Sequence, residues 1–234
     1  MSKSPPIVKK ETTFTSAGKD YKLFMAKPGH PKAAVIVIHE IWGLNNDIKR
    51  IASQFAEAGF LAVAPDLYSQ HSPVRVVMDA VFARVFGSTF KEHVLLALRD
   101  LVDFIHKDYG IQPGKIGITG FCFGGTYTYL YTTRYHDIGA AVPFYGQNPP
   151  LDEVKKINTP ILAFYGKNDK FLMPKVPALV KAFTKAKTKF THIEYEDVGH
   201  SFMNKKLPGT YKPKAARDAW RRSLGFLQQN TGAA

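Results

Sequence analysis

The chain has 234 residues, of which 45% are hydrophobic and 22% are charged. This length and composition predict one domain, residues 1–234, with a sizeable core. No apolar run approaches the roughly 18 residues that a transmembrane helix needs, and residues 1–11 lack the apolar stretch of a secretory signal. The single cysteine excludes an internal disulfide and points to a reducing compartment, so we expect a cytoplasmic protein without a membrane partner.

The formal net charge is +13, and the basic excess lies toward the C-terminus, because residues 150–234 carry 16 Lys and Arg against 7 Asp and Glu. A nucleic-acid-binding surface interleaves aromatic residues with such a patch or carries a recognised motif, and the sequence has neither. We therefore predict a solvated basic face and no nucleic-acid partner. Two alternatives stay open: the charge attracts anionic substrates, or the basic third serves a non-catalytic binding protein.

Hydrophobic periodicity predicts strands that alternate with helices along the chain. Residues 12–14 and 19–25 alternate apolar and polar side chains around Ala17 and Gly18, which is typical of an antiparallel edge hairpin. Continuous apolar runs predict buried strands, and helical spacing predicts the helices between them. After the hairpin, the prediction in chain order is a strand at 33–39, a helix at 47–58, a strand at 60–64, helices at 74–86 and 90–109, a strand from 115, a helix through 126–131, strands at 138–145 and 160–165, a helix at 174–186, a strand at 190–195 and a helix at 214–229.

This alternation predicts an α/β fold with a mostly parallel central sheet, helices on both faces and an antiparallel N-terminal edge. In open parallel sheets, ligands bind outside the carboxyl ends of the strands. The polar motifs of this chain each follow a predicted strand. We therefore expect these motifs to meet at one edge of the sheet.

The most informative motif is Gly-Phe-Cys-Phe-Gly at residues 120–124, between a β-branched run and an apolar helical run. It has the spacing of the G-x-S-x-G nucleophile elbow, with Cys122 in place of serine. So sharp a turn strains the backbone of the nucleophile, and Gly120 and Gly124 avoid collisions across it. The helix that follows directs N–H groups and a partial positive charge at the sulfur. Taken alone, the pentapeptide is also compatible with a turn around a buried, unreactive cysteine.

Asp169 and His200 follow the predicted strands at 160–165 and 190–195. Each has an ordinary alternative, Asp169 as a turn residue and His200 as a surface histidine. With Cys122 they have the order of the α/β-hydrolase fold: nucleophile, acid, histidine. We predict that His200 takes the thiol proton and that Asp169 orients the imidazole. Zinc ligation by the same three residues is an alternative that the elbow argues against, so we predict no metal and no cofactor.

The chain resembles the dienelactone hydrolase family in motifs that occur in the family's order. The shared motifs are H-E-I-W-G-L-N at 39–45, A-P-D-L-Y at 64–68, G-F-C-F-G-G at 120–125, G-x-x-D at 166–169 and G-H-S-F at 199–202. The resemblance implies an α/β-hydrolase fold and hydrolysis of carboxylic esters or lactones through an acyl-thiol intermediate on Cys122. A thioesterase or another acyl hydrolase on the same fold stays an alternative.

The resemblance also implies roles for residues near the first buried strand. It places Glu40 beside the nucleophile, where the carboxylate governs the protonation state of the thiol until substrate displaces it. Like-charge repulsion makes such control physically coherent. Without the family, Glu40 is equally compatible with a solvent-exposed loop carboxylate. The backbone N–H groups of Ile41 and Phe123 are the expected donors of the oxyanion hole.

Substrate recognition departs from the family pattern. Family members that take dienelactone hold its carboxylate with two arginines, and Asn204 stands where one of them is expected. An amide does not replace a bidentate guanidinium, which argues against dienelactone itself. Arg84 or Arg75 is the candidate for the other arginine, and Trp42, Tyr145 and Phe202 are candidate substrate contacts. We expect a small-molecule ester or lactone substrate and a monomer or homodimer.

Overall fold

The structure, a computed structural model, describes residues 6–70 and 88–233. Within them, eight strands form one sheet in the order β1-β2-β4-β3-β5-β6-β7-β8. The strands are β1 (Val8–Ser16), β2 (Lys19–Lys27), β3 (Ala34–Ile38), β4 (Leu61–Pro65), β5 (Ile116–Phe121), β6 (Ala140–Phe144), β7 (Ile161–Gly166) and β8 (Phe190–Tyr195). The β1–β2 and β2–β4 pairs are antiparallel and the other five are parallel. The predicted α/β fold is therefore confirmed.

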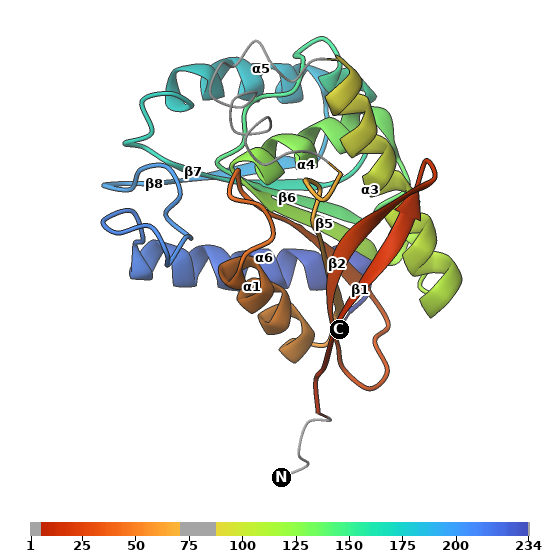
Figure 1. The fold of residues 1–234 in the computed structure, drawn as a ribbon. Helices are drawn as coiled ribbons and strands as arrows, with labels where there is room; N and C mark the ends of the chain where they lie inside the picture. Colours follow the sequence, from red (N-terminus) through yellow and green to blue (C-terminus); the bar gives the residue numbers. More distant parts are fainter. Residues whose placement is uncertain (1–5, 71–87, 234) are drawn as a thin grey trace.

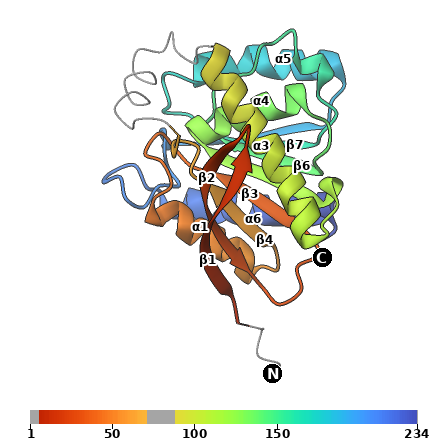
Figure 2. The same cartoon turned by 45° about the vertical axis from the view of Figure 1, so that its right-hand side comes forward.

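Helices cover both faces of this sheet (Figure 1, Figure 2). One face carries α1 (Asn46–Glu57) and α6 (Pro213–Thr231), and the other carries α3 (Ser88–Tyr109), α4 (Phe123–Arg134) and α5 (Val176–Ala186). Short 3-10 helices form at η1 (Pro113–Lys115), η2 (Val154–Lys156) and η3 (Met173–Lys175). The helix predicted at 74–86 lies outside the described residues.

The five central strands form the middle of the core, because every residue of β3, β4, β5, β6 and β7 is buried. Their continuous apolar sequences suit burial on both faces. The edge strand β8 is only partly buried, and half of its side chains are polar: Thr191, His192 and Glu194. Helix α1 shows why a helix begins where it does: the Asn45 side chain accepts hydrogen bonds from the backbone N–H groups of Asp47 and Ile48.

The N-terminal hairpin is longer than its alternating sequence predicted, since β1 and β2 pair over their whole length from Val8 to Lys27. The predicted turn is present, with φ angles of 47° at Ala17 and 72° at Gly18. Two positive φ angles give the turn a twist that matches the twist of the paired strands. The outer end of β1, from Val8 to Glu11, is exposed and carries Lys9, Lys10 and Glu11, so the sequence had no apolar alternation there to reveal the extra length.

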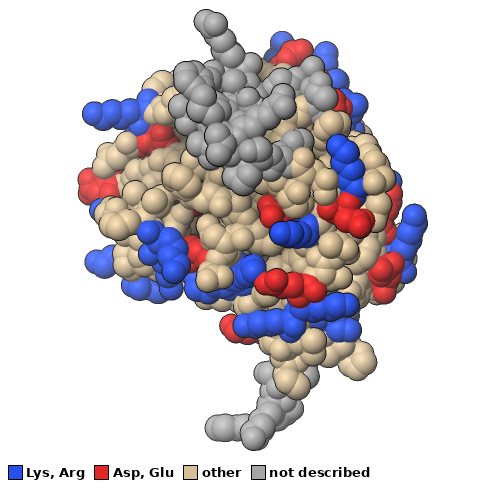
Figure 3. All heavy atoms as spheres, in the orientation of Figure 1, with Lys and Arg blue, Asp and Glu red and all other residues tan. Residues whose placement is uncertain are grey.

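The surface is charged but mixed. In Figure 3, Lys and Arg side chains are spread over the face shown, and several stand beside Asp or Glu. Among the described residues, no helix is both long and apolar enough to span a bilayer.

Candidate active site

Cys122 lies at a strained turn between β5 and α4. Its φ and ψ angles are 54° and −107°, outside the regions that ordinary residues prefer. A Cβ atom on Gly120 would lie 2.2 Å from the carbonyl oxygen of Gly124, and one on Gly124 would lie 2.4 Å from that of Ile38. The structure thus has the backbone strain and the glycine requirement that the sequence predicts for a nucleophile elbow.

The elbow is tied to the strands on either side of β5. The register pairs Ile38 of β3 with Gly120 and pairs Phe121 with Phe144 of β6, so the three strand ends are level. The N–H of Cys122 donates to the carbonyl of Phe144 across 3.0 Å, and the N–H of Gly124 donates to that of His39 across 3.1 Å. The second bond brings the segment after β3, where an oxyanion donor is predicted at Ile41, next to the first turn of α4.

Asp169 and His200 form a hydrogen-bonded pair beyond the ends of β7 and β8. His200 Nδ1 lies 2.5 Å from Asp169 Oδ2. The other carboxylate oxygen accepts from the backbone N–H groups of Phe171 and Leu172, each across 3.1 Å, which fixes the carboxylate. Burial raises the pKa of Asp169, but the bonds from His200 and these two N–H groups outweigh it, so the pKa is lowered.

The imidazole of His200 is flanked by Asp169 and Cys122. Burial lowers the pKa of His200. Hydrogen bonding to the carboxylate and to the thiol group outweighs this effect and raises the pKa to about 10. A carboxylate on one side and sulfur on the other therefore favour the imidazolium form. The ring also lies against Tyr145, with centroids 5.0 Å apart. The fold thus brings together the three residues that the sequence places after separate strands.

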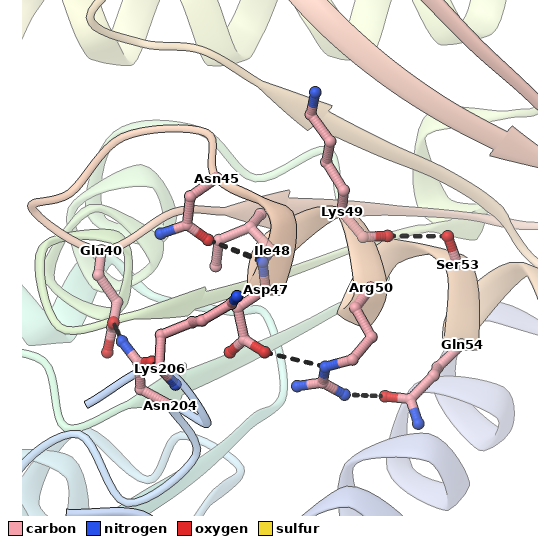
Figure 4. Close-up of polar contacts among 10 residues, drawn as sticks. All are labelled: Glu40, Asn45, Asp47, Ile48, Lys49, Arg50, Ser53, Gln54, Asn204 and Lys206. Atoms are coloured by element: carbon pink, nitrogen blue, oxygen red, sulfur yellow. Dashed lines mark hydrogen bonds and ion pairs between the residues drawn. The ribbon is translucent and has the colours of Figure 1, made fainter. Parts of the chain in front are cut away.

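Glu40 is buried, with 3% of its surface exposed. The Tyr145 hydroxyl donates to Oε1 across 3.2 Å. The amide of Asn204 donates to Oε2, as Figure 4 shows. Burial raises the pKa of Glu40, and the hydrogen bonds from Asn204, Tyr145 and Ser201 oppose that rise without cancelling it. Glu40 is therefore not a solvent-exposed loop carboxylate but part of a buried polar network next to His200.

Two of the candidate substrate contacts, Asn204 and Phe202, are buried. Asn204 is 4% exposed, and its side chain is engaged on both sides, by Glu40 and by the backbone N–H of Lys206 at 2.8 Å. Phe202 has no exposed surface and packs against the Tyr145 ring at 5.4 Å. In this structure Phe202 therefore supports Tyr145 and does not line an open site. Arg75 and Arg84 lie outside the described residues.

Trp42 does face solvent, with 56% of its surface exposed. It borders a cavity of about 410 Å³, and the other residues that line this cavity are Asn45, Asn46, Asn204, Lys206 and Leu207. The loop that carries Trp42 also carries the Ile41 N–H. Trp42 thus lies one residue along the chain from the predicted oxyanion donor Ile41, and the cavity that it borders is not lined by Cys122, Asp169 or His200.

His39 is a residue whose role the sequence did not reveal. Its Nδ1 lies 2.6 Å from the carbonyl oxygen of Glu40, and its Nε2 accepts from the N–H of Leu67 across 3.2 Å. These partners require a neutral ring with the proton on Nδ1, and burial lowers the pKa of His39 accordingly. The ring also stacks on Phe123 at 5.5 Å. A histidine that ends a fully apolar strand was the available signal, because a buried polar group needs partners.

Tyr68 stands close to the nucleophile as well. Its ring contacts Phe123 at 5.2 Å, and burial, followed by the charge of Cys122, raises its pKa. Within the described part of the chain, its buried hydroxyl has no hydrogen-bond partner. An unsatisfied hydroxyl this close to the sulfur suits a contact with a bound substrate.

Backbone strain is concentrated in this region. Cys122, Tyr145 and Ser201 all have positive φ angles, of 54°, 39° and 59°. Such conformations persist where the surrounding structure holds them, and they cluster at functional sites. In residues 6–70 and 88–233, no group of three or more His, Cys, Asp or Glu side chains is arranged to hold a metal ion.

Comparisons with known proteins identify the family. The model of the dienelactone hydrolase family matches residues 22–231. A Saccharolobus solfataricus protein named "Putative carboxymethylenebutenolidase" is 31% identical over 258 residues, covering 95% of this chain and 99% of that protein. "Protein usf" of Aquifex pyrophilus is 31% identical over 224 residues, covering 92% and 96%.

Solved structures show the same relationship. The crystal structure of a "Putative Dienelactone Hydrolase" from Klebsiella pneumoniae superposes with a TM-score of 0.85 at 27% identity, covering 96% of this chain and 99% of that one. A family match over most of the chain and a fold shared along its length point to the same assignment. The chain therefore belongs to the dienelactone hydrolase family and is an ester or lactone hydrolase of the α/β-hydrolase fold.

Proposed function

We propose that the chain hydrolyses its substrates by nucleophilic catalysis at Cys122, with His200 as base and then acid and with Asp169 as the orienting carboxylate. One observation carries the proposal: the strained elbow presents Cys122 beside an imidazole whose Nδ1 lies 2.5 Å from Asp169. An activated nucleophile needs a base within reach and a third group that orients the base, and these residues supply all three.

In the first half-reaction, His200 accepts the thiol proton and the sulfur attacks the carbonyl carbon of the ester. The carbonyl electrons move to oxygen, and the N–H groups of Ile41 and Phe123 stabilise the resulting oxyanion. Loss of one such donor typically costs about 2.7–4 kcal/mol of barrier. The carbon–oxygen bond to the alcohol then breaks, and His200 returns its proton to the departing alkoxide. An acyl group remains on Cys122.

In the second half-reaction, water attacks the acyl-thiol. His200 takes a proton from the water, the new carbon–oxygen bond forms, the carbon–sulfur bond breaks, and His200 returns the proton to the departing sulfur. The products are a carboxylic acid and the restored thiol. With a lactone, the alcohol and acid are parts of one molecule, so the product is a single hydroxy acid.

The substrate that fits best is a small ester or lactone that does not depend on an arginine for binding. The cavity beside Trp42 is about 410 Å³, which suits a small molecule. The side chain of Asn204, which stands at the position of a family arginine, is already hydrogen-bonded to the Glu40 carboxylate and to the backbone N–H of Lys206. The names of several relatives point to lactones, so unsaturated lactones belong among the substrates to test. The cytoplasmic location and the monomeric or homodimeric state stay predictions.

The test compares the wild type with Cys122→Ala on p-nitrophenyl acetate, short-chain thioesters and unsaturated lactones. We expect the variant to lose about 10³-fold or more in kcat, because its residual activity comes only from binding and the oxyanion hole. Intact-mass analysis during turnover should detect an acetylated wild type and no acetylated variant. Full activity of Cys122→Ala would remove the thiol from the mechanism. A preference for thioesters would favour the thioesterase alternative.

A further inference from the structure

The Glu40 carboxylate is held by donors from two separate segments. The Tyr145 hydroxyl, just after β6, donates to Oε1 across 3.2 Å. The Asn204 amide, in the loop after β8, donates to Oε2, as Figure 4 shows. Glu40 is 3%, Tyr145 1% and Asn204 4% exposed. A buried carboxylate that leaves such donors loses hydrogen bonds that water does not replace there.

The Asn204 amide is itself fixed in place. Its side-chain oxygen accepts from the backbone N–H of Lys206 across 2.8 Å, so the Nδ2 group must face Glu40. Its backbone N–H donates to the carbonyl of Ser201 across 2.9 Å, within the turn that follows His200. The amide therefore acts as a rigid donor toward Glu40.

The hydrogen bonds recorded for the carboxylate go to Tyr145, Asn204 and Ser201, and among the described residues none joins it to the sulfur of Cys122. Yet the sulfur is near. Burial raises the pKa of Tyr145, and the charges of Glu40 and Cys122 raise it further, so the hydroxyl lies within electrostatic reach of both groups. Meanwhile His200 lies between Asp169 and the thiol.

We propose that Asn204 is a positioning residue that, together with Tyr145, holds the Glu40 carboxylate away from Cys122, so that the thiol is available to His200 before any substrate binds. The inference rests on the proposed function, since it concerns the same nucleophile. Near the sulfur, the Glu40 carboxylate would oppose thiolate formation by like-charge repulsion. Its hydrogen bonds to Tyr145 and Asn204 prevent this approach.

This arrangement has a consequence for the substrate. A nucleophile that is ready in the free enzyme needs no charged group on the substrate to displace Glu40. Uncharged esters and lactones are then substrates as good as anionic ones. Asn204 thus stands where the family has an arginine that binds an anionic substrate group. Because the same side chain holds Glu40, the enzyme does not need such a group on its substrate.

The test measures how fast iodoacetamide, a small uncharged reagent, alkylates the thiol. The chain contains one cysteine, so intact mass reports Cys122 alone. The proteins are the wild type, Asn204→Ala, Glu40→Gln and the double variant. Asn230→Ala is the matched control, because it also removes one asparagine side-chain bond, to the carbonyl of Phe226 in α6.

We expect Asn204→Ala to be alkylated about tenfold more slowly near neutral pH, because the released carboxylate opposes the thiolate. Glu40→Gln should react no faster than the wild type, and adding it to Asn204→Ala should restore the wild-type rate. In Asn204→Ala, the acid limb of the kcat/KM profile should move to higher pH. Asn230→Ala should match the wild type in both measurements.

Three results would overturn the inference: a wild-type alkylation rate in Asn204→Ala, a faster rate in Glu40→Gln, or a slow double variant. Should Asn204→Ala fail to fold, Tyr145→Phe removes the other donor and should likewise slow alkylation, with reversal by Glu40→Gln. Failure of the proposed function is a separate result. It is full hydrolytic activity in Cys122→Ala, whatever the alkylation rates are.

Discussion

The backbone N–H of Gly124 lies 3.1 Å from the carbonyl oxygen of His39, to which it donates a hydrogen bond. This bond joins the first turn of α4 to the end of β3. No side chain separates the two segments, because a Cβ on Gly124 would lie 2.4 Å from the carbonyl oxygen of Ile38. The spacing between the nucleophile and the predicted Ile41 donor is therefore set by backbone contact alone.

Gly124→Ala should damage catalysis more than folding. The added methyl group forces α4 away from β3, and a displacement of about 1 Å at a catalytic centre costs about 100-fold in rate. The strain should also lower the free energy of unfolding by about 1–3 kcal/mol. The measurements are kcat with p-nitrophenyl acetate and urea denaturation. Gly114→Ala is the matched control, since a Cβ there meets no atom within 4 Å. Equal activity in the two variants would contradict the prediction.

Asp169→Asn should keep the fold but lose most of the activity. An amide can present its N–H₂ group to His200 Nδ1 and so favour the wrong tautomer, and it no longer supports the imidazolium charge. We expect kcat to fall by about 10³- to 10⁴-fold, as for the equivalent change in a serine triad. Asp152→Asn, at an exposed carboxylate, serves as the control and should be fully active. If Asp169→Asn retained more than about a tenth of wild-type kcat, the orienting role would be wrong.

The neutral state of His39 predicts a loss of stability on the acid side. Burial lowers its pKa below the ordinary 6.5, so the unfolded chain binds a proton at pH values where the folded chain does not. The free energy of unfolding should therefore fall as the pH drops below about 6.5. His200 has the opposite sign: because its pKa is raised to about 10, its contribution is fully present below the ordinary 6.5 and is lost as the pH rises from there to about 10.

Urea denaturation between about pH 6.5 and about pH 5, where the His200 contribution is constant, checks this prediction. His39→Gln should be less stable overall, by about 1–3 kcal/mol, because at least one buried hydrogen bond is lost. Its stability should nevertheless change less over this pH range. An unchanged acid slope in His39→Gln would assign the effect to another group. Asp169 does not interfere, because its lowered pKa places its contribution at more acid pH.

Trp42→Ala should separate binding from chemistry. The indole borders the cavity but lies outside the hydrogen-bonded set of Cys122, His200 and Asp169. For an ester with an aromatic alcohol, we expect KM to rise about three- to tenfold with kcat within about twofold, the pattern of lost uniform binding. Leu151→Ala, another exposed apolar side chain, should change neither constant. A loss confined to kcat would place Trp42 in the chemical step instead.

Strand positions were predictable because strands buried on both faces have continuous apolar sequences. The site followed from them: Cys122, Asp169 and His200 each come after a strand, and parallel strands bring their carboxyl ends to one edge. The length of the N-terminal hairpin was less visible. The outer end of β1 carries exposed lysines and no apolar alternation.

Side-chain directions within the turns were not predictable. Asn204 stood out only as a missing arginine, whereas the structure makes it a donor to Glu40. Its direction depends on the turn after β8, where Ser201 has a φ of 59°, a value that no residue spacing encodes. Phe202 is adjacent to that turn and points into the core. The role of His39 likewise could not be predicted, because its hydrogen-bond partners, the carbonyl of Glu40 and the N–H of Leu67, come close only in the folded chain.

The candidate residues lie on connecting segments, whereas the side chains of the strands that carry these segments are buried in the core. The strands thus determine the fold, whereas the connecting segments determine which substrates are accepted. Homologues can therefore change their substrate specificity through insertions in the connections after β6 or β8. Drift in the interior would be tolerated only where it preserves volume.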